Sequence, residues 1–513
     1  MRNQLDNSHY FIIVIKYGGY KKMSVVRNLP VVRERKQAIL SGDAALIAEQ
    51  KKAGKLTARE RINALLDAGS FVELDVLNAD AGVVAGYGTV ENNPVCVYAQ
   101  DFTVGGGAVG EKHARKVLKV MELAEKTGCP VVGMLDSAGA KLDEGVAALD
   151  AYARIAAKAT ALSGVVPQIA LIMGPCGGTA SVVAEIADFT VQSKAGQLFV
   201  NGPLVVSAVS GKKVDMTEIA GNEASAKSGS AMIVAENDEG AIAAAKQLIT
   251  MLPVNNLDEA VFTCEDSENR EIPALNGIES IEDIRDVLAK VADNGDFVEL
   301  YKDFASSMVA ALAKIGGRTV GIIANDSSKD EGRLTVYGCK KAARLIAFCD
   351  AFSIPVVSFV DSLGMKISAA PQGELARAGA SLLYAMSETS APKISVIAGN
   401  AIGMAYAAMA SKAVNDMVYA WPGAVISAVS TPIATQLLLG DEMTGADDPI
   451  AKRAELEEKY ACDIADGVNA AKNGYVDDVI EPASTRAIIS AALEMLSGKR
   501  ENKIAKKHGN LPL

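Results

Sequence analysis

Histidine is scarce in this chain of 513 residues, which contains His9, His113 and His508 and no other histidine. None of the three lies in a pattern typical of a serine or cysteine catalytic triad. Histidine is the side chain that most often acts as a general base near neutral pH. Any chemistry that this protein performs is therefore expected to use a base other than histidine.

Cysteine is also sparse, and the seven cysteines form neither a CxxC pair nor a short spacing typical of a metal site. No apolar run reaches the ~18 residues that a membrane-spanning helix needs. The net charge of −11 argues against a general nucleic-acid surface. These absences favour a cytoplasmic protein in a reducing compartment, with no metal in this chain and no nucleic acid among its partners.

Half of the residues are hydrophobic, and the sequence is rich in Ala, Gly and Val, as expected of a globular protein. A chain of this length is too long for one core, so two domains of about 200–250 residues are expected. Residues 1–22 resemble nothing later in the chain. We expect Met23 to be the native start and residues 1–22 to be a non-native or disordered extension.

Two segments with nearly the same sequence indicate that the chain repeats itself. PVVGMLDSAGAK at 130–141 and PVVSFVDSLGMK at 355–366 are identical at seven of twelve positions, at an offset of 225. FVEL occurs at 71–74 and again at 297–300. Repeats at one offset indicate duplicated structural units. The predicted units are two homologous domains, 23–262 and 275–513, joined by a linker at 263–274.

Within each half, short apolar strands alternate with amphipathic helices, which is typical of an α/β sheet buried on both faces. Asp-Ser-x-Gly ends one strand of each half, and a glycine-rich turn joins the next strand to an alanine-rich helix. The predicted strands are 95–100, 131–135, 168–173, 320–324, 356–360 and 393–397. The predicted helices are 111–127, 146–162, 178–187, 339–351, 373–388 and 403–412.

The two glycine turns, 174–180 and 399–405, are the strongest candidates for a site. Each opens a helix, whose first backbone N–H groups have no partner within the helix. The loops DSAGA at 136–140 and DSLGM at 361–365 could bring a second N–H to the same point. Two convergent N–H donors make an oxyanion hole. The alternative is that glycine only permits close packing of strand and helix, but the duplication favours the hole.

Other motifs have simpler interpretations. GxGxxG at 105–110 lies between a strand and a helix, but the second half lacks it, which disfavours a dinucleotide site. The basic run at 51–62 could meet phosphates through Lys55, Arg59 and Arg61, or could form a solvated helix face. Cys176 has no nearby base in the sequence and is expected to be a packing residue.

Six segments spread along the chain have sequences typical of one protein family: KLTARERINALLDAGSFVELD (55–75), VYAQDFTVGGGAVGEKHARKV (97–117), GPCGG (174–178), YAWP (419–422), GYVDDVIEP (474–482) and KHGNLPL (507–513). Through these segments the chain resembles the biotin-dependent acyl-CoA carboxyltransferases, from about residue 30 to the C-terminus. That family includes the β subunits of propionyl-CoA and acetyl-CoA carboxylases and the carboxyltransferase subunits of methylmalonyl-CoA decarboxylase and transcarboxylase.

The resemblance implies two tandem crotonase-like (ClpP/crotonase) α/β domains and a carboxyltransferase subunit. Such a subunit moves a carboxyl group between carboxybiotin on a carrier protein and the α-carbon of a short acyl-CoA, through thioester and biotin enolates held in two backbone oxyanion holes. The first domain would hold the thioester and the second would hold biotin. The implied partners are a biotin carboxyl carrier protein, a biotin carboxylase or membrane decarboxylase subunit, and further copies of this chain, commonly in a hexamer.

The resemblance also implies which residues form the site. Gly178 and Thr179 would donate to the thioester oxygen, and Met404 and Ala405 would donate to the biotin oxygen. Lys141 stands where the family usually has Arg and could steer the CoA phosphate. The remaining residues implied for substrate binding are Ala138, Gly139, Gly177, Gly364 and Gly403.

Two departures from the family pattern leave alternatives open. The family usually has glycine at the positions of Thr179 and Met404, so side chains there would narrow both pockets. A non-catalytic scaffold subunit of a carboxylase or decarboxylase complex is therefore an alternative. A different crotonase-type enzyme would need a side-chain acid or base, for which Glu144 or Asp136 are candidates. The sequence does not determine which acyl-CoA is used or the direction of transfer.

Overall fold

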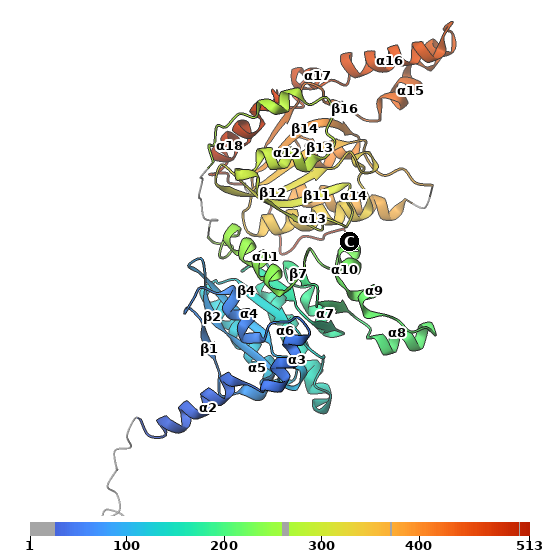
Figure 1. Ribbon diagram of the computed structural model, residues 1–513. Coiled ribbons are helices and arrows are strands. Elements are labelled where there is room, and N and C mark those ends of the chain that lie inside the picture. Colours follow the sequence, from blue (N-terminus) through green and yellow to red (C-terminus); the bar gives the residue numbers. More distant parts are fainter. Residues whose placement is uncertain (1–25, 259–265, 370–371, 502, 513) are drawn as a thin grey trace, which may run out of the picture.

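The computed structural model describes residues 26–258, 266–369, 372–501 and 503–512. The expected extension at 1–22 lies outside these residues, as does part of the predicted linker, so both stay predictions. Two large β-sheets dominate the molecule and occupy two lobes, one from each half of the chain (Figure 1). Among the described residues, no helix is both long enough and apolar enough to cross a membrane.

The first sheet has the strand order β1-β2-β3-β4-β5-β7-β9. Its first three strands are antiparallel, and the later strands run parallel. The parallel strands are short and apolar because helices cover both faces. The strands are β1 (Val72–Leu74), β2 (Val83–Val90), β3 (Asn93–Gln100), β4 (Val131–Leu135), β5 (Gln168–Ile172), β7 (Phe189–Ser193) and β9 (Ile233–Ala235).

The second sheet repeats this topology in the order β10-β11-β12-β13-β14-β15-β17. Even the register is repeated, since Cys96 pairs with Val131 in the first sheet and Gly321 pairs with Val356 in the second, 225 residues later. The predicted duplication is confirmed at this level. The strands are β10 (Phe297–Leu300), β11 (Met308–Ile315), β12 (Arg318–Asn325), β13 (Val356–Ser362), β14 (Lys393–Ile402), β15 (Met417–Ala420) and β17 (Asp478–Val479).

Amphipathic helices cover both faces of each sheet, and three of the six predicted helices have the predicted bounds. The helices of the first domain are α3 (Ala44–Lys52), α4 (Ala58–Leu65), α5 (Glu111–Thr127), α6 (Val146–Leu162), α7 (Thr179–Ala184), α10 (Asn222–Ser228) and α11 (Asp238–Met251), preceded by α2 (Leu29–Ser41). The helices against the second sheet are α12 (Ile284–Val291), α13 (Val336–Ala351), α14 (Gly373–Glu388), α17 (Gly467–Lys472) and α18 (Thr485–Met495).

One hydrophobic core runs through both domains. It begins between α4, α11 and the first sheet, and it continues into α13, α14 and the second sheet without interruption. The rings of Phe189 and Phe348 meet across the domain boundary with centroids 4.8 Å apart. Thr319 Oγ1 donates to the carbonyl oxygen of Met251 at 2.6 Å. The two domains are therefore packed together through side chains as well as joined by the chain.

The last predicted helix, 403–412, takes a different form. The structure has a π-helical turn at Tyr406–Ala410 in its place. Asn415 Nδ2 donates to the carbonyl oxygens of Met409 and Ser411 at 3.0 and 3.1 Å, which satisfies backbone acceptors where the turn ends. The prediction of a regular helix through residue 412 is therefore wrong.

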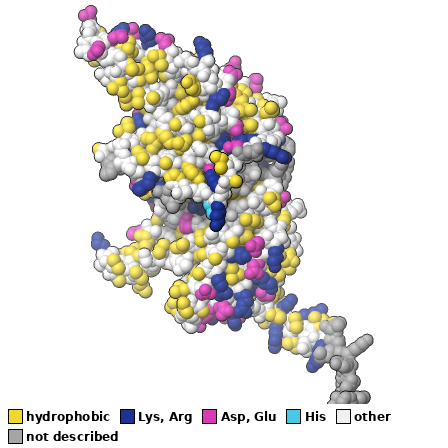
Figure 2. Space-filling model, turned by 180° about the vertical axis from the view of Figure 1, so that it is seen from behind, with side chains coloured by type: hydrophobic (Ala, Val, Ile, Leu, Met, Phe, Trp, Pro, Cys, Tyr) yellow, Lys and Arg dark blue, Asp and Glu magenta, His cyan; other side chains and the backbone are white. Residues whose placement is uncertain are grey.

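Two helical arms project from the body, one from each domain (Figure 1). The first is formed by α8 (Pro203–Ser210) and α9 (Met216–Ala220), and the second by α15 (Thr431–Thr444) and α16 (Pro449–Asp463). Hydrophobic side chains gather on both arms in Figure 2. The large apolar residues that the arms expose include Leu204, Val205, Val209, Ile433, Leu437, Leu438 and Ile450. Apolar surfaces of this kind commonly mark sites of protein association.

Candidate active site

The candidate site of each domain lies where two adjacent parallel strands end. In the first domain, β4 leads into the loop at 136–140 and β5 leads into the turn at 174–178. The short strand β6 (Pro175–Gly177) then pairs with β8 (Gln197–Phe199). In the second domain, the end of β14 pairs in the same way with β16 (Val425–Ser427). The duplication thus produces the same pair of segments twice.

Gly178 and Gly403 turn the chain from strand to helix. Their φ angles are 62° and 55°, a region that side chains other than glycine rarely adopt. The N–H of Gly178 donates to the carbonyl oxygen of Phe199 at 2.9 Å, and the N–H of Gly403 donates to the carbonyl oxygen of Ser427 at 2.8 Å. The prediction that Gly178 supplies a free N–H is therefore wrong, because the pairing of β6 with β8 already uses it.

The next residues do present free amides. Thr179 is the first residue of α7, and its N–H has no hydrogen-bond acceptor among the described residues. The same holds for the N–H groups of Met404 and Ala405, at the start of the helical turn in the second domain. These donors are left over because the first N–H groups of any helix lack an acceptor one turn earlier. Of the four predicted donors, Thr179, Met404 and Ala405 thus remain available.

The opposite loop contributes a residue that sequence reasoning missed. The N–H of Ala138 donates to Gly106 O at 2.8 Å, and that of Gly139 donates to Ser137 Oγ at 3.1 Å, so neither is free. The following residue, Ala140, has a free N–H within the described part of the chain. It forms an isolated parallel bridge with Val109, which leaves this amide unbonded.

The second domain has the same arrangement, 225 residues later. Gly364 N–H donates to Ser362 Oγ at 3.1 Å, and the free amide belongs to Met365, which bridges Leu334. We call Ala140 with Thr179 the first amide pair, and Met365 with Met404 the second amide pair. The sequence pattern that could have identified Ala140 and Met365 is the repeat, since each residue directly follows the glycine of Asp-Ser-x-Gly.

In both domains the loop and the turn lie side by side. Ser137 N–H donates to Pro175 O at 2.9 Å, which ties the first loop to the first turn. In the second domain Gly364 approaches Ile402 so closely that a Cβ would lie 3.0 Å from its carbonyl oxygen. The side chains of Met365 and Met404 also approach the same residue of α14, Gly379. Each amide pair is thus built from neighbouring backbone segments.

The predicted phosphate contacts have other partners in the structure. Lys55 Nζ lies 2.9 Å from Asp136 Oδ1, and Arg61 Nη1 lies 2.9 Å from Asp136 Oδ2. Arg61 is fully buried, so a phosphate cannot reach it, and that prediction is corrected for this residue. Arg59 pairs with Glu73 at 2.9 Å, as its repeat equivalent Arg285 pairs with Glu299. Paired arginines at equivalent positions indicate a structural role.

The remaining predicted binding residues lie around the first amide pair. Lys141 is half-buried and pairs with Glu144 at 2.9 Å, close to the outer end of the loop. Gly177 lies under the ring of Phe199, where a Cβ would be only 2.3 Å from a ring carbon. A position for Lys141 beside a substrate stays a prediction.

The structure does not favour the two carboxylates that could act as an acid or base. Glu144 accepts the N–H of Glu111 at 2.6 Å, and this bond, with the ion pair to Lys141, lowers the pKa of Glu144. Asp136 is fully buried and its two oxygens are held by Lys55, Arg61 and Gln50. Neither carboxylate is therefore placed to exchange protons with a substrate.

Two other titratable groups near the site are neutral at pH 7. Burial raises the pKa of the Cys176 thiol to about 12, which agrees with a packing role. Burial lowers the pKa of His113 to about 4. Neutral, enclosed groups of this kind supply neither a nucleophilic thiolate nor a charged acid.

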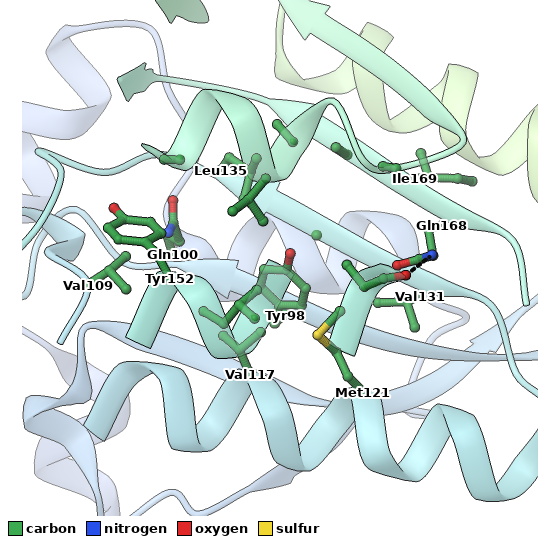
Figure 3. A pocket seen from close by; sticks show the side chains of 18 of the residues that line it. Tyr98, Gln100, Val109, Val117, Met121, Val131, Leu135, Tyr152, Gln168 and Ile169 are labelled. Atoms are coloured by element: carbon green, nitrogen blue, oxygen red, sulfur yellow. Dashed lines mark hydrogen bonds between the residues drawn. The ribbon is translucent and has the colours of Figure 1, made fainter. Parts of the chain in front are cut away.

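A small cavity of about 50 Å³ lies inside the first domain between α5, α6, α7 and the sheet. Its lining is mostly apolar, and Tyr98 and Tyr152 project into the space in Figure 3. The hydroxyl of Tyr152 has no hydrogen-bond partner among the described residues. Ala180, the second residue of α7, also lines this cavity. Helix α7 therefore forms one wall of the cavity, and its first residue, Thr179, carries one of the free amides.

Helix α7 ends at a buried carboxyl group that should make stability depend on pH. Burial raises the pKa of Glu185 to about 7, although nearby Arg344 opposes the shift. A raised folded-state pKa stabilises the fold fully below the unfolded value of 4.5, and the contribution is lost as the pH rises through about 7. Relative to the unaltered chain, Glu185→Gln should therefore gain stability as the pH rises from 4.5 to 7. Melting temperatures of both proteins across this range test the sign, and parallel curves would contradict it.

The face around the first amide pair is apolar and open. Leu142 is 89% exposed, Val182 is 55% exposed and Val200 is 62% exposed. Exposed apolar side chains beside two free backbone N–H groups indicate a surface that another molecule or subunit covers.

The comparisons with known proteins agree with this geometry. Residues 49–511 match the carboxyl transferase domain family. The chain is 41% identical over 504 residues to the methylmalonyl-CoA carboxyltransferase 12S subunit of Propionibacterium freudenreichii subsp. shermanii, covering 93% of this chain and 96% of the relative. It is 40% identical over 517 residues to the propionyl-CoA carboxylase beta chain of Saccharopolyspora erythraea, covering 94% and 95%.

A solved structure extends the likeness to three dimensions. The transcarboxylase 12S crystal structure, a hexamer with methylmalonyl-coenzyme A and methylmalonic acid bound, matches with a TM-score of 0.90 at 40% identity. The match covers 96% of this chain and 99% of that chain. The predicted fold of two tandem crotonase-like domains is thereby confirmed.

Proposed function

The chain belongs to the carboxyl transferase family, and from this premise we propose that it transfers a carboxyl group between carboxybiotin and a short acyl-CoA. It is a carboxyltransferase of the kind found in propionyl-CoA carboxylase and in methylmalonyl-CoA carboxyltransferase. The observation that supports the detailed proposal is the pair of free backbone amides, present once in each domain at equivalent positions.

The first amide pair would bind the thioester oxygen of the acyl-CoA. Removing the α proton of a thioester puts negative charge on that oxygen, and Ala140 and Thr179 would donate to it. Fixed N–H donors stabilise such developing charge without reorganising, and losing one typically costs 10²–10³ in rate. The chain needs no side-chain acid for this step, which fits the neutral His113 and the engaged carboxylates of Asp136 and Glu144.

The second amide pair fits biotin. The N–H groups of Met365 and Met404, with that of Ala405, are neutral donors suited to a ureido oxygen, which is an acceptor. Biotin, bound through a separate carrier protein, would supply the carboxyl group and the base that removes the α proton. The two methionine side chains would form an apolar wall beside it, because both already contact α14.

The site is proposed to be completed by a second copy of this chain. The apolar face around the first amide pair and the two apolar arms support this, since each leaves large side chains in solvent. The transcarboxylase 12S relative is a hexamer in a multienzyme core. We propose a homo-oligomer, most simply a hexamer, in which the first domain of one subunit faces the second domain of another. The other proposed partners are a biotin carboxyl carrier protein and a biotin carboxylase or membrane decarboxylase subunit, in the cytoplasm.

The test is a transfer assay with free biotin. The purified chain is incubated with methylmalonyl-CoA or malonyl-CoA, with and without free biotin, and formation of propionyl-CoA or acetyl-CoA is followed. Biotin-dependent decarboxylation of one substrate supports the proposal, and the ratio of rates identifies the acyl group. Absence of biotin-dependent conversion at saturating substrate would favour the scaffold alternative instead.

A further inference from the structure

Arg61 joins the ends of the two strands that lead into the first amide pair. Its Nη1 donates to Asp136 Oδ2 at 2.9 Å, directly after β4, and its Nη2 donates to the carbonyl oxygen of Met173 at 2.9 Å, directly after β5. A single planar guanidinium therefore spans both strand ends. The distance between them is set by the fixed geometry of its donors.

The guanidinium is itself held in place. Its Nε donates to Asp238 Oδ2 at 2.7 Å, and the same oxygen accepts the N–H of Leu56 at 3.0 Å. Lys55 Nζ contacts both oxygens of Asp136, at 2.9 and 3.0 Å. Arg61 is fully buried, so its pairs are formed away from solvent, where charged hydrogen bonds are strong and directional.

Few residues separate the ends of β4 and β5 from the N–H groups of Ala140 and Thr179, so the distance between the strand ends affects the distance between these two donors. Met173 N–H donates to Leu135 O at 2.9 Å, and Ser137 N–H donates to Pro175 O at 2.9 Å. Ala140 lies three residues after Ser137, and Thr179 lies four residues after Pro175. A change at the strand ends would therefore alter the separation of the two donors.

We call Arg61, with its bonds to Asp136 and Met173, the clamp, and the second domain lacks it. The helix α4 and α12 segments align at an offset of 226, which places Val287 at the position of Arg61, while the neighbouring pairs Arg59–Glu73 and Arg285–Glu299 are equivalent. The carboxylate equivalent to Asp136 is Asp361, and it accepts from Asn400 alone among the described side chains. Since the same topology forms without a guanidinium, the fold does not require one.

We propose that Arg61 is a positioning residue that sets the spacing of the first amide pair by clamping Asp136 and Met173. The proposal rests on the proposed carboxyltransferase function. It predicts an effect on the thioester step, because only the acyl-CoA side contains the clamp. A donor displaced by about 1 Å can cost up to 10²-fold in rate.

The test compares Arg61→Lys with Arg486→Lys. Lysine keeps the positive charge, but its single ammonium group cannot bind Asp136, Met173 and Asp238 at once as the guanidinium of Arg61 does. Arg486 is the matched control, because it is also fully buried, pairs with Asp293 at 2.7 Å and donates to a backbone oxygen, that of Val291. Methylmalonyl-CoA decarboxylation with free biotin is measured for kcat and KM, well below the melting temperature of each variant.

We expect Arg61→Lys to lower kcat by roughly 10-fold or more with little change in the KM for acyl-CoA, since the amides act mainly on the transition state. Arg486→Lys should lower the melting temperature without changing kcat. The inference is overturned if Arg61→Lys loses stability but keeps its kcat, or if both variants lose the same factor. If the unaltered chain shows no biotin-dependent conversion, the proposed function itself fails, which is a distinct result.

Discussion

Thr179→Pro should abolish most of the carboxyltransferase activity while leaving the fold intact. Proline lacks the N–H that we assign to the thioester oxygen, so the variant loses one donor of the first amide pair. Thr179 is the first residue of α7, where proline is well tolerated because its N–H makes no bond within the helix. The preceding residue, Gly178, has a positive φ and no Cβ, so it can also precede proline.

The expected loss in kcat is about 10²–10³-fold, the usual effect of removing one oxyanion donor. Thr179→Gly is the matched control, because it removes the side chain and keeps the N–H. It should retain activity of the same order as the unaltered chain. Melting temperatures of both variants verify folding. Full activity of a folded Thr179→Pro variant would show that the N–H of Thr179 does not stabilise the thioester oxygen.

Gly174→Ala should destabilise the protein far more than the equivalent change Gly399→Ala. Both glycines lie against an aspartate, and an added Cβ would lie 1.9 Å from Asp136 Oδ1 in the first domain and 2.3 Å from Asp361 Oδ1 in the second. Asp136 cannot move without breaking its buried pairs with Lys55 and Arg61. Asp361 is only partly buried, and Asn400 is the partner that its side chain has to release.

Breaking a buried ion pair costs about 3–5 kcal/mol, whereas overpacking alone costs about 1–3 kcal/mol. We therefore expect the free energy of unfolding to fall by about 3 kcal/mol or more for Gly174→Ala, and by clearly less for Gly399→Ala. Chemical denaturation of both variants at equal protein concentration measures the difference. Equal losses would show that the ion pairs around Asp136 do not hold it in place.

Much of the fold could be predicted because the sequence carries its pattern twice. The offset of 225 located both sheets, and helices α5, α6 and α14 have the predicted bounds. Glycine lies at both ends of α5 and directly before α6, which marks these ends in the sequence. The π-helical turn at 406–410 was missed, since its hydrogen bonds differ from those of an α-helix without a distinct residue pattern.

The site was only partly predictable from the residues. The rule that helix N-termini have free amides indicates the turns 174–180 and 399–405, and the family resemblance adds Thr179 and Met404 within them. The resemblance implies a free N–H at Gly178, but the structure uses this N–H in a bond to the carbonyl oxygen of Phe199. That acceptor lies 21 residues away, and a sequence does not show which strands pair. Ala140 and Met365 were missed for a related reason. Their backbone N–H groups are unbonded because of the bridges to Val109 and Leu334, which a sequence does not show either. For Arg61 the sequence leaves a phosphate contact and a solvated helix face open, and the structure excludes both because the side chain is fully buried. Burial of this kind depends on tertiary structure.

The core that continues from one lobe into the other has a consequence for the evolution of such duplicated chains. If the halves were made as separate polypeptides, each would present the apolar surface that the other now covers, including the aromatic contact of Phe189 with Phe348. Genetic fusion keeps these surfaces together at a high effective concentration. Heating should accordingly melt both lobes in a single cooperative event, and fission of the gene should yield halves that are soluble only when co-expressed.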